Sequence, residues 1–275
     1  MVETFDSRAG FFECPILSVN NLSDAIYLMR LYSPTIAKNS YPGQFVNIKV
    51  NDEFIPLLRK PFSVCRRDAK NGWFEVLWKI VGKGTEVMSR LQSGEQVNVL
   101  GPLGHGFTIS KDLELAILIG GGLGVAPLPF LCVELLKAGK KVEVFLGAKS
   151  AHELAFVDEF LQMGVEVFIT TEDASVGEQG LITELLIERL KQKSRPGKVT
   201  FFSCGPTGFL NSMIRVSENF NIAGQMAIET MMGCGFGICV GCPVRVRDPQ
   251  PGERLYKLTC VDGPVFDARE VILHG

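Results

Sequence analysis

Four cysteines near the carboxyl end of the chain have the spacing of an iron–sulfur ligand set. Cys234, Cys239 and Cys242 follow a C-x4-C-x2-C pattern, and Cys260 lies further along. This is the plant-type spacing for a 2Fe–2S cluster. Glycines stand among these thiols, and because glycine lacks a Cβ, such a loop can curl around a small inorganic core. The glycines are Gly233, Gly235, Gly237 and Gly241.

These four cysteines could instead bind zinc, form disulfides or remain plain thiols. A zinc site also uses four cysteines, but it commonly pairs two short C-x2-C spacings, which this loop does not have. Disulfides belong to oxidising compartments, and nothing in the sequence marks the chain as secreted. The spacing therefore favours iron and sulfide, with zinc and plain thiols as the alternatives. Cys14, Cys65 and Cys132 have no partners at a metal-ligand spacing and are expected in the core.

Two stretches in the first hundred residues could hold a phosphate group. In the first, proline fixes the backbone, an aromatic ring can stack, and the cations and hydroxyl can contact phosphate. The second is a glycine turn that opens a short helix, where free N–H groups attract anions. Either stretch alone is also common in purely structural roles. The candidate binding residues are Arg59, Lys60, Pro61, Phe62, Ser63, Val81, Gly82, Gly84 and Thr85.

A third glycine-rich turn, residues 120–127, has the context of a dinucleotide-binding loop. It follows an apolar strand and precedes a helix, and Gly122 and Gly124 let a pyrophosphate approach the backbone. A Cys204-Gly205-Pro206 turn ends a later strand, at the edge where open α/β sheets place ligands. A buried structural role is the commoner fate of such a cysteine.

The two nucleotides NAD and NADP are harder to separate from the sequence. Lys149 follows one strand and could meet a 2′-phosphate, whereas Glu172 and Asp173 follow another and could hold a 2′-hydroxyl while repelling a phosphate. The carboxylates favour NAD, and NADP is not excluded.

The elements that would position these residues fall into three stretches. Up to about residue 110, short apolar runs separated by turn residues predict an antiparallel β-barrel with one helix near 84–91. From 111 to 222, strands alternate with helices, which predicts a doubly wound α/β domain. From 223 to 275, a last strand, the cysteine loop and a hairpin near 248–252 predict a small cluster module. The fold class predicted is therefore α+β and multidomain.

Composition limits the possible functions. The 275 residues are 46% hydrophobic and 21% charged, as in globular proteins with sizeable cores. The formal net charge of −2 gives no sign of nucleic-acid binding. The most apolar run, residues 115–131, is interrupted by glycines and prolines and does not read as a membrane span. The first residues contain no apolar signal segment, so we expect a cytoplasmic protein.

Five motifs together resemble one known family. Arg59-Lys60-Pro61-Phe62-Ser63, the Gly82-Lys83-Gly84-Thr85 turn and residues 101–107 resemble the flavin-binding barrel of the ferredoxin–NADP reductase superfamily. Residues 120–127 resemble its nicotinamide-nucleotide loop, and residues 259–268 resemble the electron-transfer subunit of class 1B dihydroorotate dehydrogenase. The likeness runs from about residue 10 to 272.

This resemblance implies FAD in the barrel, NAD on the α/β domain and a 2Fe–2S cluster at the end. It also implies a catalytic position for Cys204, beside the nicotinamide and flavin rings. The family usually has arginine before the proline, on the FAD pyrophosphate. This chain has Lys60 there, with Arg59 just before it, and a lysine offers a point charge rather than a fork.

The implied function is electron transfer. NADH carries hydride, a cluster carries single electrons, and FAD can exchange one for the other. The implied partner is an FMN-containing dihydroorotate dehydrogenase catalytic subunit in a heterotetramer, with electrons running from FMN through the cluster and FAD to NAD. Two alternatives are the small subunit of a sulfide dehydrogenase or electron-bifurcating oxidoreductase, and a non-catalytic redox sensor that binds NAD(H).

Overall fold

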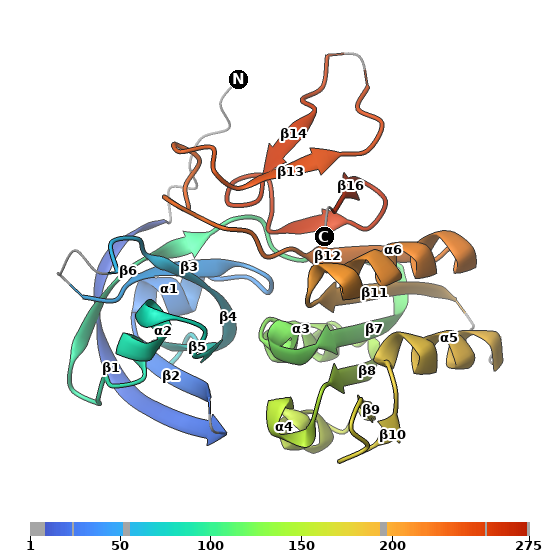
Figure 1. The fold of residues 1–275 in the computed structure, drawn as a ribbon, viewed down its shortest axis with the longest axis horizontal. Helices are drawn as coiled ribbons and strands as arrows, with labels where there is room; N and C mark the ends of the chain where they lie inside the picture. Colours follow the sequence, from blue (N-terminus) through green and yellow to red (C-terminus); the bar gives the residue numbers. More distant parts are fainter. Residues whose placement is uncertain (1–8, 24, 52–55, 193–196, 251, 274–275) are drawn as a thin grey trace.

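The computed structural model describes residues 9–23, 25–51, 56–192, 197–250 and 252–273. Its first part is a closed antiparallel barrel with strand order β1-β2-β5-β4-β3-β6 (Figure 1). Alternate side chains fill the barrel, among them Val46, Ile48, Val64 and Val76, all fully buried. The strands are β1 (Gly10–Ser23), β2 (Ile26–Tyr32), β3 (Phe45–Lys49), β4 (Lys60–Asp68), β5 (Trp73–Lys79) and β6 (Gln96–Leu103).

Two short helices accompany the barrel, one more than the sequence predicted. Helix α2 (Lys83–Met88) is the predicted one. Helix α1 (Pro34–Asn39) is the additional one, and it begins at a Ser33-Pro34 pair that is also common in turns. Here Ser33 caps the helix, its hydroxyl accepting the N–H of Ile36 at 3.4 Å, and Pro34 occupies the first turn, where its missing N–H costs nothing.

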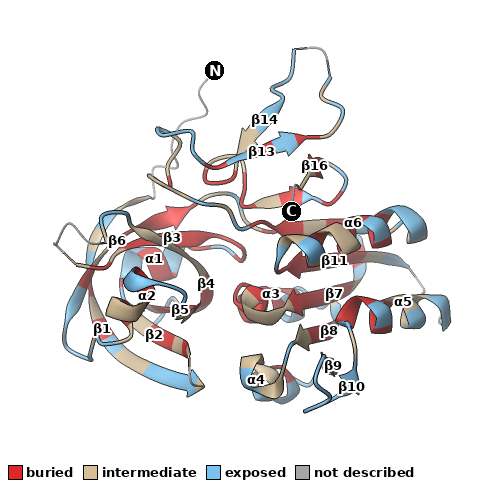
Figure 2. Ribbon diagram, viewed as in Figure 1, coloured by how far each residue is buried: buried red, intermediate tan, exposed pale blue. Residues whose placement is uncertain are grey.

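The second part is a seven-stranded sheet with order β10-β9-β8-β7-β11-β12-β15. All neighbours pair in parallel except β12 and β15. Figure 2 shows the central strands β7 and β11 largely buried. The strands are β7 (Leu113–Gly121), β8 (Lys141–Ala148), β9 (Glu166–Thr171), β10 (Glu178–Gln179), β11 (Lys198–Cys204), β12 (Ala223–Ala227) and β15 (Val265–Asp267).

Helices cover both faces of this sheet, so the predicted fold class is confirmed. Helices α3 and α4 pack on the face toward the barrel, and α5 and α6 pack on the other. Residues 151–162 do not form one continuous helix, because Phe156 has a left-handed backbone and α4 begins after it. The helices are η1 (Gly122–Val125), α3 (Leu128–Lys137), η2 (Ala151–Glu153), α4 (Val157–Gln162), α5 (Ile182–Gln192) and α6 (Thr207–Phe220).

The cysteine loop and a three-stranded sheet follow β12. The sheet has order β14-β13-β16, and its antiparallel pair β13–β14 is the predicted hairpin. Strand β15 leaves this region to pair with β12, so the large sheet continues past residue 223, where the sequence placed the start of the cluster module. The strands are β13 (Pro243–Val246), β14 (Tyr256–Leu258) and β16 (Val271–Ile272). Among the described residues, no helix combines the length and apolar character of a membrane span.

Candidate functional site

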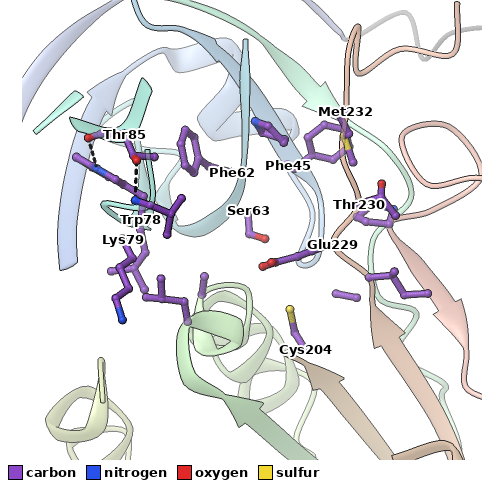
Figure 3. Close-up of a pocket in the computed structure, with 18 residues that line it drawn as sticks. Phe45, Phe62, Ser63, Trp78, Lys79, Thr85, Cys204, Glu229, Thr230 and Met232 are labelled. Atoms are coloured by element: carbon purple, nitrogen blue, oxygen red, sulfur yellow. Dashed lines mark hydrogen bonds between the residues drawn. The ribbon is translucent and has the colours of Figure 1, made fainter. Parts of the chain in front are cut away.

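A cavity of about 280 Å³ lies where the barrel, the large sheet and the cysteine loop meet (Figure 3). Strand β4 contributes Pro61, Phe62 and Ser63, three of the predicted binding residues, while the turn before α2 contributes Val81 and the first turn of α2 contributes Thr85. The remaining lining comes from all three parts of the chain. It comprises Phe45, Leu77, Trp78, Lys79, Leu123, Ala126, Cys204, Ala227, Ile228, Glu229, Thr230, Met232 and Pro264.

The side chains that line the cavity suit a flat aromatic cofactor. Phe62 and Trp78 form its barrel wall, with ring centroids 6.3 Å apart and planes tilted by 54°. Such rings offer a large apolar surface for stacking. The Thr230 hydroxyl oxygen is buried and has no hydrogen-bond partner within the described residues. An orphaned buried hydroxyl in an apolar cavity is costly, so it suits a bound polar edge. The residues present therefore fit a flavin ring.

The turn before α2 is held rigid by Thr85. Its hydroxyl oxygen accepts the N–H groups of Val81 at 2.9 Å and Gly82 at 3.2 Å, and it donates to the Gly82 carbonyl at 2.9 Å. Thr85 is therefore occupied within the turn, while the Val81 side chain is exposed beside the cavity.

The two cations of the first motif point to different places. Arg59 donates to the carbonyl of Asn98 at 3.0 Å and to that of Asn47 at 3.3 Å, and it lies over the Phe11 ring at 5.1 Å. Lys60 instead crosses Gly84, where an added Cβ would overlap its side chain. Lys60 thus lies against the glycine turn, and neither cation is among the described residues that line the cavity.

Glu229 is a site residue that the sequence reasoning missed. Strand β11 pairs with β12 so that Cys204 lies opposite Ala227, and Glu229 follows two residues later. In Figure 3 its carboxylate points toward the Ser63 hydroxyl, with the Cys204 sulfur on the same side of the cavity. The sequence predicts a strand that ends at Glu229, but it does not show that β11 and Cys204 lie beside that strand. The position of Glu229 in the site could therefore not be predicted.

Burial controls the ionisation of this pair. The Glu229 side chain faces the open cavity, yet surrounding protein atoms raise the pKa of its carboxyl above the ordinary value. Burial, with the Glu229 charge as a smaller cause, raises the pKa of the Cys204 thiol well above its ordinary range. Cys204 is therefore a neutral thiol at physiological pH and not a thiolate nucleophile.

The predicted nucleotide loop lies at the switch point of the sheet, where β7 leads one way and β11 the other. Cys204 pairs with Gly120, so the two turns that follow these strands face one another. Gly124 packs so tightly that an added Cβ would overlap the Cys204 carbonyl oxygen. Gly122 has φ of +55° and open space around it, as a backbone that receives a ligand requires.

Two further cavities extend along this carboxyl edge. One of about 300 Å³ is lined by Gly122, Gly124, Gly205, Pro206 and Glu229, and so joins the two turns to the first cavity. The other, of about 260 Å³, also touches Gly122 and Pro206 and continues past β8 and β9. Open α/β sheets bind dinucleotides in this position.

Two of the three charged residues weighed for nucleotide choice, Lys149 and Glu172, line the 260 Å³ cavity. Asp173 does not. Its carboxylate accepts the hydroxyl and N–H of Ser175, at 2.5 and 3.0 Å. The Thr170 hydroxyl in the same cavity is buried without a partner among the described residues.

The four predicted cluster thiols gather as two pairs. Cys242 and Cys260 are buried, with their sulfurs 3.2 Å apart. Cys234 accepts the N–H of Cys239 at 3.4 Å, and Cys239 is exposed. Within the part of the chain that the structure describes, no three cysteine, histidine or acidic side chains gather closely enough to hold one metal ion. Two pairs suit two bridged irons better than one tetrahedral zinc.

Backbone hydrogen bonds prepare these sulfurs for a metal. Cys234 also accepts the N–H of Phe236 at 3.5 Å, and Cys239 accepts that of Gly241 at 3.4 Å. Burial raises the pKa of Cys234, but the N–H bonds outweigh it and lower the pKa to about 7. The Cys260 thiol lowers the pKa of Cys242 to about 6, and the same pairing raises the pKa of Cys260 well above its ordinary range. Thiolate is the form that ligates metal, so Cys234 and Cys242 have the shifts that suit cluster ligands.

Two protein-family models match the chain. Residues 13–107 match the oxidoreductase FAD-binding domain, which covers the barrel. Residues 229–272 match the iron–sulfur cluster binding domain of dihydroorotate dehydrogenase B, which covers the cysteine loop.

Solved structures share the fold. The structure of an NADH-dependent reduced ferredoxin-NADP oxidoreductase, described in terms of flavin-based electron bifurcation, has a TM-score of 0.83 and 28% identity. The alignment covers 96% of this chain and 91% of that one. A ferredoxin NADP+ reductase from Neisseria gonorrhoeae, solved with FAD and NADP, has a TM-score of 0.65 at 19% identity. The alignment covers 76% of this chain and 91% of that one, and it shows the fold alone.

Curated relatives cover nearly the whole chain. The electron transfer subunit of dihydroorotate dehydrogenase B (NAD+) from Desulforamulus reducens is 33% identical over 95% of this chain and 98% of its own length. The subunit of the same name from Geobacillus thermodenitrificans is 37% identical over 94% of this chain and 97% of its own length. The resemblance found in the motifs is thereby confirmed, and the chain belongs to the family of dihydroorotate dehydrogenase B electron transfer subunits.

Proposed function

We propose that this chain is an FAD- and 2Fe–2S-containing oxidoreductase subunit that passes electrons from dihydroorotate oxidation to NAD. The position of the 280 Å³ cavity carries this proposal. On one side it touches the nucleotide turns through Leu123 and Cys204, and on the other it touches the cysteine loop through Met232. FAD bound there would exchange single electrons for hydride between those two neighbours.

The chain's own residues position the reactants. Phe62 and Trp78 provide a stacking wall, and the Thr230 hydroxyl is available to a polar edge of the ring. Glu229 lines both the flavin cavity and the 300 Å³ cavity at the nucleotide edge, and Cys204 lines the flavin cavity at the end of β11. These two side chains would hold the nicotinamide against the flavin and keep water out. The surrounding protein raises the pKa of the Glu229 carboxyl, and it raises that of the Cys204 thiol well above its ordinary range, so Cys204 does not present a thiolate nucleophile.

The nucleotide would lie along the carboxyl edge of the sheet. Its pyrophosphate would meet the backbone at Gly122 and Gly205, and its adenosine would enter the 260 Å³ cavity. Glu172 in that cavity suits the 2′-hydroxyl of NAD, as the names of the relatives also suggest.

The catalytic partner would bind over the exposed end of the cysteine loop. Ile238 and Val240, the sequence neighbours of exposed Cys239, are 77% and 63% exposed, and Met231, which precedes the loop, is 89% exposed. Exposed apolar side chains of this kind suit a protein interface. We propose an FMN-containing catalytic subunit as the partner, a heterotetramer as the assembly, and the reducing cytoplasm as the compartment.

The experiment compares three reactions of the purified protein. The isolated chain should reduce a dye with NADH, should not oxidise dihydroorotate, and should support dihydroorotate-dependent NAD reduction once the catalytic subunit is added. Extraction should release FAD rather than FMN, and iron and sulfide should match one 2Fe–2S cluster. Zinc without iron, or the absence of flavin, would overturn the cofactor assignment.

Variants separate the two halves of the relay. Cys239→Ser should abolish the coupled reaction while stopped-flow traces still show hydride transfer from NADH to FAD. Cys132→Ser, at a buried thiol outside the cluster set, should leave both reactions intact. A coupled reaction that survives loss of the cluster would show that electrons bypass it.

Electron bifurcation is the second candidate, favoured by the 0.83 TM-score to the NADH-dependent ferredoxin oxidoreductase. Purification of the chain with its natural partner decides between them. Dihydroorotate turnover supports the first function, and ferredoxin-dependent NADP reduction supports the second.

A further inference from the structure

Strand β3 turns two buried side chains outward from the barrel. Val46 and Ile48 belong to the barrel core, so Phe45 and Asn47 alternate with them on the outer face. Side chains on the outer face of a barrel are usually exposed to solvent, yet Phe45 is 3% exposed and Asn47 is fully buried. The cysteine loop covers them, because Phe45 belongs to one apolar cluster with Cys242 and Cys260.

Asn47 bonds directly to that loop. Its side-chain nitrogen donates to the backbone carbonyl of Cys234, a predicted cluster ligand, at 3.0 Å. The next residue, Gly235, has φ of +83°, and an added Cβ there would overlap the Asn47 amide. A buried amide in a strand is costly unless it has a partner. The cysteine loop supplies the partner of the amide nitrogen, while the amide oxygen is buried without a hydrogen-bond partner among the described residues.

Phe45 lies between the two redox sites. It lines the flavin cavity, where Figure 3 shows it at the same end as Met232, and both belong to the apolar cluster of Cys242 and Cys260. The buried pair of thiols thus faces the flavin cavity across Phe45, while Cys239 faces outward.

We propose that Asn47 is a positioning residue that fixes the cluster against the flavin barrel, with Phe45 filling the gap between them. This rests on the proposed function. Electrons then pass between cluster and FAD by way of the buried Cys242–Cys260 side. The transfer makes and breaks no bond: one site loses an electron and the other gains it. Because tunnelling falls steeply with distance, a loosened loop slows this step without affecting hydride transfer.

The test uses the full chain with FAD and cluster bound. Asn47→Leu removes the amide at similar volume, and Asn98→Leu is the matched control, since Asn98 lies on neighbouring strand β6 and its side chain bonds Arg59 and Glu13. With NADH in stopped flow, Asn47→Leu should leave flavin reduction unchanged and slow cluster reduction about 10-fold, the lower end for losing an outer-shell partner. Its reduced cluster should also show a shifted electron paramagnetic resonance spectrum.

Phe45→Leu separates packing from positioning. It should slow cluster reduction with the spectrum unchanged, because Phe45 makes no bond to the loop. If Asn47→Leu lacks iron while Asn98→Leu retains it, the loop depends on the Asn47 amide and the proposal stands. In that case the rate of cluster reduction is measured on Asn47→Asp, which keeps the shape of the side chain. An Asn47→Leu protein with wild-type rate and spectrum would overturn the proposal. A wild-type chain without iron or flavin would instead overturn the proposed function.

Discussion

Some of the functional residues can be predicted from the residues next to them in the sequence, and others cannot. The four cluster thiols and the glycines among them could be predicted, because a metal loop carries its ligands at short, fixed spacing. Glu229 and Asn47 could not, since each acquires its role from a residue more than twenty positions away, Cys204 and Cys234 respectively. A single sequence does not contain those pairings.

Lys60 and Arg59 give a prediction at the residue scale. Lys60→Ala is expected to weaken FAD binding by about 1.5–3 kcal/mol, the range for a hydrogen bond to a charged group. Lys60 lies against the Gly84 turn, whereas Arg59 is held by Asn98 and Asn47. Arg59→Ala, the control, should therefore retain FAD. Flavin retained after ultrafiltration measures both, and the reverse ranking would assign the phosphate to Arg59.

Glu229 predicts a pH dependence of stability. Burial raises its pKa above the ordinary value of 4.5, so the folded chain binds more protons than the unfolded chain between those two values. The free energy of unfolding should therefore fall as pH rises through that window, and Glu229→Gln should flatten this part of the curve. Urea denaturation at several pH values measures it, with exposed Glu166→Gln as control. Equal slopes in wild type and Glu229→Gln would contradict the assignment.

At the scale of elements, alternation of strands and helices sufficed to predict the doubly wound sheet, and short apolar runs sufficed for the barrel. The predictions that were wrong concern segments whose local sequence is compatible with two structures. Ser33-Pro34 suits either a turn or a helix start, and Phe156 interrupts a helical pattern by a left-handed backbone that its residue type does not announce. The antiparallel strand β15 depends on a partner forty residues earlier, so no local signal reveals it.

The contact between η1 and the end of β11 gives the prediction at this scale. Gly124→Ala places a Cβ onto the Cys204 carbonyl and must separate the two nucleotide turns. We expect the rate of flavin reduction by NADH to fall at least about tenfold, since small displacements of reacting groups are costly. Lys137→Ala, on the exposed surface of α3 where Lys137 pairs with Glu134, should leave the rate and the melting temperature nearly unchanged. Stopped-flow absorbance and thermal denaturation report these outcomes, and an unaffected Gly124→Ala would show that the turns are not tightly coupled.

The whole molecule is joined across the barrel and the α/β domain by charged side chains. Arg66 of β4 pairs with Glu159 of α4 at 2.6 Å and also with Glu75, whose side chain is 1% exposed. Arg30 reaches the same Glu75 at 2.9 Å. Lys79 of β5 meets Glu153 of η2 at 2.6 Å beside the nucleotide edge. The relative position of the two domains, on which hydride transfer depends, therefore rests partly on ion pairs.

Arg66 provides the prediction at this scale. Arg66→Met should lower the free energy of unfolding by about 1.5–3 kcal/mol, because buried Glu75 loses a charged hydrogen bond and retains only Arg30. The control is Arg90→Met, whose pair with Glu86 is exposed and should contribute no more than about 1 kcal/mol. Urea denaturation followed by tryptophan fluorescence compares them. Equal losses would mean that Arg66 contributes no more to stability than a surface cation does.

Strand β15 has a consequence for any attempt to divide the chain. It covers the side of β12 that would otherwise end the seven-stranded sheet with unpaired backbone groups. An uncovered edge of this kind recruits strands from other molecules and leads to aggregation. A shortened protein that stops after β12, designed to keep the flavin and nucleotide sites without the iron–sulfur part, would therefore lose the strand that covers this edge of the sheet. The C-terminal segment that carries the cluster cysteines thus also carries the strand that protects the nucleotide domain from aggregation.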